Sequence, residues 1–143
     1  MRKGFTLIEI MIVVAIIGII AGLAIPNVTR MRIVGNISKA KGDLRALQSA
    51  AENYYIHHNN TYPSALSNLT SAVPKIISVI PKDPFNVANS YGYKLSTSGT
   101  YYAIYSIGQN SNGNVSVNDS GNITETNPAT CIFVSNAGED AQP

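Results

Sequence analysis

A long stretch without charged side chains near the start of the chain limits most strongly what this protein can fold into. Residues Ile10 to Ile25 contain no charged side chain, and they follow directly on one acid, Glu9. As one helix, Phe5 to Ile25 would rise about 31 Å at about 1.5 Å per residue, close to the hydrocarbon thickness of a bilayer of about 30 Å. The sequence therefore predicts a hydrophobic transmembrane helix over residues 5–25.

The residues before this stretch form a motif of their own. Arg2 and Lys3 make a short basic leader before Gly4 and Phe5, and Glu9 follows four places after that phenylalanine. A carboxylate inside a membrane costs several kcal/mol by insertion scales, so it requires a partner and a purpose. The pattern resembles the prepilin signature of type IV pilins and of type II secretion pseudopilins.

In that family a dedicated prepilin peptidase cuts after the glycine and N-methylates the next residue. The resemblance implies cleavage between Gly4 and Phe5 and methylation of Phe5, with residues 1–4 as the leader peptide. The new α-amine would be positive near neutral pH, and the family's assembly scheme pairs it with the Glu9 carboxylate of a neighbouring subunit. Alternatively, Glu9 only marks the peptidase site or extends toward the lipid headgroups. Ordinary export with a cut at the small residues 21–24 is a further alternative.

Three residues weaken the far end of this helix. Gly18 and Gly22 each lower helix propensity by about 1 kcal/mol relative to alanine, and Pro26 has no N–H to donate to the carbonyl of Gly22. In related filaments this stretch becomes extended, so we expect Gly18, Gly22 and Pro26 to soften the helix on assembly. The two glycines also form a G-x-x-x-G pair, which favours close helix contact in a membrane.

Residues 26–55 are amphipathic and are expected to continue the helix to about Tyr55. Apolar residues recur at spacings of three and four, the period of a helix with one buried face. The segments His57–Asn60 and Tyr62–Pro63 are expected to stop the helix. The apolar positions are 33, 37, 40, 44, 47, 51 and 54, and the polar residues of the opposite face are Lys39, Asp43, Arg45, Gln48 and Glu52.

Residues 56–143 are predicted to form a globular β-sheet head. A three- or four-stranded antiparallel sheet packed on the amphipathic helix would bury both apolar faces. The predicted pieces are a short helix near 65–73 and strands at 91–95, 101–107, 115–117 and 131–134. Similarity to the major pseudopilin branch extends to residues 62–63, 81–85, 91–93 and 105–108. The expected fold class is α+β: a long N-terminal helix packed on a small antiparallel sheet, the pilin fold.

No catalytic motif and no confident cofactor site is found, so we predict that the chain is not an enzyme. Major pseudopilins bind calcium in the loop after Gly108, but here residues 109–114 carry amides where the family has aspartates. Calcium prefers several oxygen ligands, charged ones above all, which leaves Asp119 as a weak calcium ligand. A metal site at His57–His58 is disfavoured. Cys131, the single cysteine, is expected to be a small buried apolar residue, with an intermolecular bridge or a reactive thiol as alternatives.

These features favour a structural subunit that polymerises through residues 5–25 into a type IV pilus-like filament. A major pseudopilin of a type II secretion system is the close alternative, and a singly displayed membrane-tethered binding module is an alternative of another class. The expected partners are copies of the chain itself, the prepilin peptidase, an inner-membrane assembly platform with its ATPase, and minor pilins.

The precursor is expected to cross the bacterial inner membrane once, with its N-terminus in the cytoplasm. After assembly it would belong to an extracellular pilus or a periplasmic pseudopilus. The net charge of +2 comes from ten cations and eight acids. Without Arg2 and Lys3 the two signs balance, so no nucleic-acid partner is indicated.

Overall fold

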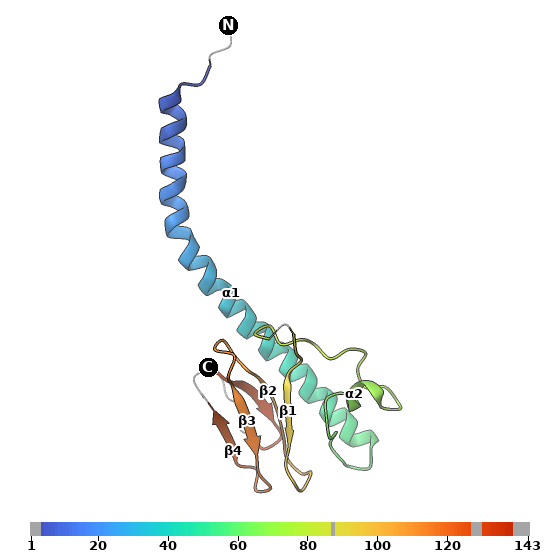
Figure 1. Cartoon of the computed structure of the whole chain (residues 1–143). Helices are drawn as coiled ribbons and strands as arrows, with labels where there is room; N and C mark the ends of the chain where they lie inside the picture. The colour runs from blue at the N-terminus through green and yellow to red at the C-terminus, as the bar shows by residue number, and fades with distance from the viewer. Residues whose placement is uncertain (1–3, 87, 127–129, 139–143) are drawn as a thin grey trace. The chain divides into compact units, whose positions relative to one another are not determined.

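The computed structural model describes residues 4–86, 88–126 and 130–138. The chain divides into two compact units, Met1–Gly35 and Asn36–Pro143, and one long helix contributes residues to both. The predicted α+β class, with a long N-terminal helix packed on a small antiparallel sheet, is confirmed (Figure 1). The elements are α1 (Leu7–His57), α2 (Asn68–Ser71), β1 (Gly92–Leu95), β2 (Tyr102–Ser106), β3 (Asn114–Val117), β4 (Ile123–Thr126) and β5 (Ile132–Ser135).

Helix α1 begins where a threonine can satisfy one of its first amide groups. The backbone N–H of Glu9 donates to the Thr6 hydroxyl over 3.3 Å and to the Thr6 carbonyl over 3.2 Å. A side-chain oxygen at this place pairs a donor that the first helical turn leaves open. The helix therefore begins at Leu7, two residues later than the predicted start at Phe5.

Most apolar side chains of the first unit are exposed. Phe5 is 76% exposed and Leu23 is 75% exposed, and most other large apolar side chains described up to Val34 resemble them. A helix that is apolar on all sides is typical of a segment surrounded by lipid or by other helices. Among the described residues, α1 is the one helix long and apolar enough to cross a membrane.

Helix α1 ends at His57 because two asparagines turn the chain. Asn59 and Asn60 have φ angles of 52° and 56°, in the left-handed region that asparagine adopts more readily than most residues. The Asn60 N–H then donates to the Tyr55 carbonyl over 3.2 Å. The predicted end near Tyr55 is thus two residues early.

The apolar stripe of α1 forms one side of the main core. Ala40, Leu44 and Ala51 are completely buried, and Ile37 and Tyr54 pack against them. Each of these positions was predicted from the helical spacing. The other buried residues of this core are Leu47, Ala50, Leu66, Leu69, Tyr91, Tyr102, Ile104, Ile132 and Val134.

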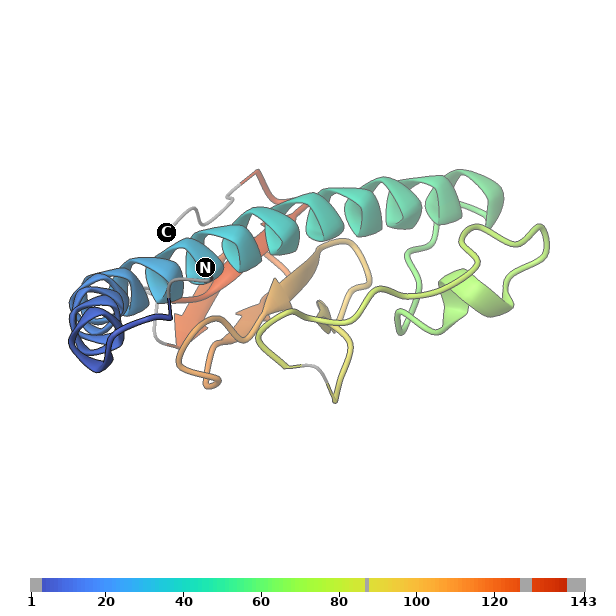
Figure 2. The ribbon, with the colours of Figure 1, turned by 90° about the horizontal axis from the view of Figure 1, so that it is seen from above.

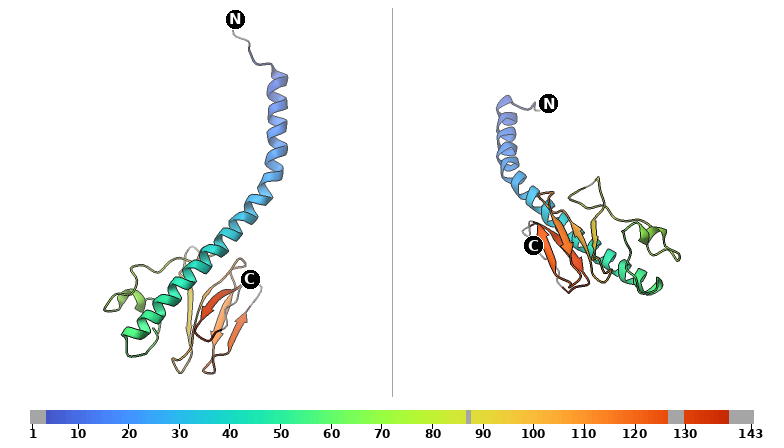
Figure 3. Two further views of the ribbon diagram at one scale, coloured as in Figure 1. Left: turned by 180° about the vertical axis from the view of Figure 1, so that it is seen from behind. Right: turned by 60° about the horizontal axis from the view of Figure 1, so that its bottom comes forward.

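The central strand, β2, is covered on both faces. The three-stranded sheet has the order β1-β2-β5 and is antiparallel throughout, and Figures 2 and 3 show it along the C-terminal part of α1. Successive side chains of a strand point to opposite faces. Tyr102 and Ile104 accordingly join the core against α1, while Ala103 and Tyr105 join a second core with Val115 of β3.

Two sheets are present where a single sheet was expected. Strands β3 and β4 pair with each other as a separate antiparallel hairpin. Strand β4 was not predicted, because it is short, only half-buried on alternate residues, and preceded by a run of Asn, Ser and Gly. Helix α2 covers Asn68–Ser71, a shorter segment than the predicted 65–73.

Candidate functional site

The predicted cleavage position lies outside the helix. Gly4 and Phe5 are exposed and have no regular secondary structure, so a peptidase can bind this backbone without unwinding a helix. Glu9 is exposed in the first turn of α1, where the helix dipole favours a negative charge. Its carboxylate makes no hydrogen bond or ion pair within the described residues. A positive partner for Glu9 would therefore have to come from the processed amine or from another molecule.

The helix-softening residues all lie inside α1. Gly18 and Gly22 have open space around them, so a Cβ at either position would touch nothing in the described chain. Neither glycine is therefore required for packing within this molecule, which leaves helix propensity and contact with another helix as their physical roles. Pro26 also lies within the bounds of α1. Extension of this stretch upon assembly stays a prediction.

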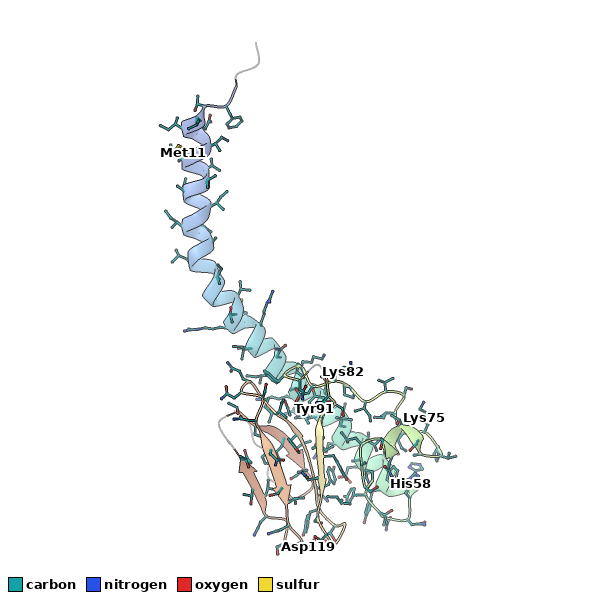
Figure 4. All side chains as sticks on the ribbon, viewed as in Figure 1. Met11, His58, Lys75, Lys82, Tyr91 and Asp119 are labelled. Carbon is teal, nitrogen blue, oxygen red and sulfur yellow. The ribbon has the colours of Figure 1, made fainter. Side chains whose placement is uncertain are left out.

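Polar residues of α1 fasten the head to the helix. The Glu52 carboxylate accepts hydrogen bonds from the hydroxyls of Tyr102 at 2.7 Å and Tyr62 at 3.1 Å. The Asp43 carboxylate accepts from the Tyr91 hydroxyl at 2.9 Å, and Tyr91 lies against α1 in Figure 4. Glu52 and Asp43 were assigned to the polar face opposite the apolar stripe, but both flank the stripe and bind head tyrosines.

These contacts change the chemistry of the tyrosines. Burial, followed by the hydrogen bond to Glu52, raises the pKa of Tyr102 well above its ordinary value of 10.0. Burial, followed by the hydrogen bond to Asp43, does the same to the pKa of Tyr91. Burial also raises the pKa of Tyr93, whose buried hydroxyl has no partner among the described residues. All three hydroxyls therefore keep their protons to a higher pH than an exposed tyrosine does.

Asp83 is a buried carboxylate that holds the segment before β1 to the end of β2. It is 1% exposed, and its oxygens accept from the Ser106 hydroxyl at 2.9 Å, the Ile107 N–H at 3.1 Å and the Phe85 N–H at 2.9 Å. A buried charge with three donors is a structural anchor, because an unpaired carboxylate there would be costly. The sequence identified residues 81–85 as family-like but gave Asp83 no role.

The weak calcium candidate, Asp119, already has a backbone partner. It lies in the turn between β3 and β4, labelled in Figure 4, and accepts the Ser98 N–H at 2.6 Å. That hydrogen bond lowers the pKa of the exposed Asp119 carboxyl. Within residues 4–86, 88–126 and 130–138, no group of three or more His, Cys, Asp or Glu residues could hold a metal ion. The loop after Gly108 is closed by its own backbone, with the Gly113 N–H donating to Ile107 O at 2.9 Å.

His57, His58 and Cys131 have local roles. The His58 ring stacks on Tyr54 with centroids 3.9 Å apart, and the His57 ring lies within hydrogen-bonding distance of the Asn53 carbonyl. Cys131 is completely buried in the second core, and burial raises the pKa of its thiol to about 11. The expectation of a small buried residue fits this position.

A polar cavity near the end of α1 was also not predicted from the sequence. Its volume is about 410 Å³, and its walls come from four separate segments: the end of α1, residues 60–62, residues 98–101 and Asn136. No sequence spacing brings these segments together. The only local signal was the density of tyrosines in the head.

Two family descriptions match consecutive parts of the chain. "Prokaryotic N-terminal methylation motif" matches residues 1–25, and "Type II secretion system (T2SS), protein G" matches residues 27–125. The chain belongs to the type II secretion system protein G family. The first match covers the predicted cleavage position and Glu9. The second covers the remainder of α1 and the head as far as β4.

Individual relatives of this protein G family chain include secretion proteins and a pilin. The type II secretion system core protein G of Pseudomonas aeruginosa is 33% identical over 132 residues, covering 82% of this chain and 91% of the relative. The core protein G of Vibrio cholerae is 35% identical over 108 residues, 65% of this chain and 72% of that protein. The type IV major pilin PilA of Myxococcus xanthus is 37% identical over 95 residues, 66% of this chain and 37% of PilA. No solved structure matches the chain.

Proposed function

We propose that this chain is the repeating structural subunit of a pseudopilus-type secretion filament. The observation that carries the proposal is the exposed apolar surface of α1, with the unpartnered carboxylate of Glu9 in its first turn. An isolated copy of such a helix needs a membrane, and a bundle of copies covers the same surface without one. The match to protein G over residues 27–125 supports secretion ahead of the type IV pilus-like filament that the sequence favoured.

A type IV pilus subunit is the second proposed function. The similarity to PilA over 95 residues supports it, as do the amides of the loop after Gly108. In both functions the chain contributes its helix to the filament core and its head to the filament surface. The two differ in where the filament ends and in what it acts on.

The proposed maturation begins with the chain anchored in the inner membrane. Arg2 and Lys3 keep the N-terminus in the cytoplasm, and the head lies on the other side. The prepilin peptidase hydrolyses the Gly4–Phe5 bond and methylates the amine of Phe5. An assembly platform with its ATPase then moves the subunit into the filament, which minor pilins start.

The charge pair selects each incoming subunit. The Phe5 amine of one copy meets the Glu9 carboxylate of its neighbour, and the low dielectric constant around them strengthens their attraction. A subunit placed out of register leaves a carboxylate unpaired among apolar side chains, which is strongly unfavourable. Gly18, Gly22 and Pro26 then allow the helix to extend where neighbours crowd it.

The test replaces Glu9 in cells that make the filament. Glu9→Val and Glu9→Gln should both abolish filaments in electron micrographs, while mass spectrometry still finds a methylated Phe5 terminus. Glu9→Asp, which keeps the charge, is the matched control and should retain assembly in part. Normal filaments from the Glu9→Val variant would contradict the charge pair, whereas unchanged function without any filament would favour a singly displayed membrane-tethered module. Deleting the gene and assaying secreted proteins alongside surface fibres separates pseudopilus from pilus.

A further inference from the structure

The polar cavity near the end of α1 lies wholly within the Asn36–Pro143 unit. Three tyrosine rings line it: Tyr55 from the last turn of α1, Tyr62 from the following loop, and Tyr101 immediately before β2. The cavity lies beside the end of α1, because Tyr55 of the last turn is one of its lining residues. Its volume of about 410 Å³ falls within the range of about 300–1,000 Å³ typical of small-ligand sites.

The aromatic walls are fixed before any ligand arrives. The Tyr62 ring lies between two others, with centroids 4.5 Å from Tyr55 and 4.7 Å from Tyr102, and its hydroxyl is held by Glu52. The Tyr101 ring lies against Gly121, so closely that a Cβ added there would lie 3.2 Å from its carbons. Rings held in this way lose little conformational entropy on binding.

The polar groups of the lining have unused hydrogen-bonding capacity. The Asn136 amide donates to Thr100 O at 2.8 Å and accepts the Tyr102 N–H at 2.8 Å, and it also hydrogen-bonds the Tyr62 side chain. These contacts orient it and leave the second lone pair of its amide oxygen available to a ligand. The Asn60 side chain makes no hydrogen bond to another described residue, nor do the hydroxyls of Tyr55 and Tyr101. The site thus offers both donors and acceptors.

The described lining residues carry no charge. A phosphorylated or carboxylated ligand would give up its hydration without gaining a cationic partner, which is unfavourable. A purely apolar ligand would leave the amides and hydroxyls without water or a partner. The ligand that fits is therefore neutral, rich in hydroxyl or amide groups, and equipped with C–H faces that can lie on aromatic rings, whose faces are electron-rich.

We propose that this cavity binds a neutral carbohydrate. The rings of Tyr55 and Tyr101 contact the C–H face of a sugar, and the amides of Asn60 and Asn136 pair with its hydroxyl or N-acetyl groups. This site belongs to the head alone and does not rest on the assembly mechanism. It gives a filament subunit a means to hold glycans, through chemistry that the apolar helix does not provide.

The test uses the full chain in micelles of a zwitterionic detergent, because a sugar-headed detergent would compete. Triacetylchitotriose and maltotriose serve as neutral probes, and a glucuronate-containing trisaccharide is the charged comparison. Saturation-transfer NMR should show a neutral probe bound with its sugar protons close to tyrosine. Titration should give an affinity for the charged probe at least about tenfold weaker.

Substitutions of the lining tyrosines test whether the probe binds in the cavity. Tyr101→Ala and Tyr55→Ala should each weaken binding of the neutral probe about tenfold, and Tyr101→Phe should keep most of it. Tyr54→Ala is the matched control, because its ring stacks on His58 and is not among the lining residues. Circular dichroism selects the variants that are folded.

The proposal is overturned if neither neutral probe binds with a Kd below about 10 mM, or if the charged probe binds equally well. It is also overturned if both tyrosine-to-alanine variants bind the neutral probe as the unaltered chain does.

Discussion

The Tyr102 hydroxyl in β2 donates a 2.7 Å hydrogen bond to the Glu52 carboxylate in α1, across 50 positions of the chain. Tyr102 is completely buried, and the half-buried Glu52 carboxylate would keep only the hydroxyl of Tyr62 as a partner. Tyr102→Phe should therefore lower the free energy of unfolding by about 1.5–3 kcal/mol, the usual value for a hydrogen bond to a charged group. Chemical denaturation of the full chain in micelles measures the change.

The control for that experiment is Tyr105→Phe. The Tyr105 hydroxyl has no hydrogen-bond partner among the described residues, so its removal should change stability by less than about 0.5 kcal/mol. Equal effects from the two substitutions would show that the contact with Glu52 contributes nothing.

Gly108 and Gly99 allow two reasons for a glycine to be tested separately: a positive φ angle, and a lack of space for a Cβ. Both have positive φ, 68° and 73°, but a Cβ at Gly108 would collide with the Thr130 carbonyl, whereas one at Gly99 would meet nothing. Gly99→Ala should cost about 1 kcal/mol for backbone strain alone. Gly108→Ala should cost a further 1–3 kcal/mol, on the order of other steric overpacking. Similar melting temperatures for both variants would refute the close approach.

The thiol of Cys131 should not react with disulfide reagents in the folded protein. It is completely buried, and its pKa of about 11 leaves little thiolate at neutral pH. A chromogenic disulfide reagent should therefore react with it only after denaturant is added. Ser116→Cys supplies the matched control, because residue 116 is exposed on β3. Rapid labelling of Cys131 in the folded chain would show that the second core opens readily.

Alkaline conditions should unfold the head. The folded-state pKa values of Tyr91, Tyr93 and Tyr102 lie above the ordinary value of 10.0, so the folded protein retains these protons where the unfolded chain releases them. The resulting stability is complete below pH 10 and is lost as the pH rises above it. The thiol of Cys131 adds a loss that begins above its ordinary pKa of 9.0 and extends to about 11.

Ultraviolet absorbance of tyrosinate and circular dichroism, recorded together across this pH range, measure the alkaline transition. The buried tyrosines should ionise together with unfolding. Their gradual ionisation near pH 10 in a head that keeps its fold would contradict the assignment.

The helix and its buried stripe could be predicted because both depend on local spacing. The positions of Ala40, Leu44 and Ala51 followed from a helical period. The end of α1 followed to within two residues from the segments His57–Asn60 and Tyr62–Pro63. The strands rich in tyrosine and β-branched residues were found for the same reason. Strand β4 was not predicted, because its four half-exposed residues are too few to show a clear alternation of apolar and polar side chains.

The remaining features depend on residues far apart in the sequence. Asp83 anchors Ser106 and Ile107 only because the chain folds back, and nothing near Asp83 indicates those partners. The cavity walls likewise come from four segments, so their residues looked like ordinary turn and strand residues. The roles of Glu52 and Asp43 were missed because a helical wheel separates polar from apolar positions but cannot show which polar groups meet tyrosines.

Strands β2 and β5 lie between two cores, and the β3–β4 hairpin covers the core on the side away from α1. Phe133 and Cys131 face it, and Val115 from the hairpin is 1% exposed in the same cluster. Cutting the chain at the hairpin's exposed tip would leave the hairpin over the sheet. Deleting the hairpin would instead expose the apolar side chains of the second core, which favours aggregation. Fluorophores or epitope tags for watching the filament in living cells therefore should not replace the hairpin, and a tag at its tip should spare Asp119 and Gly121, which contact Ser98 and Tyr101.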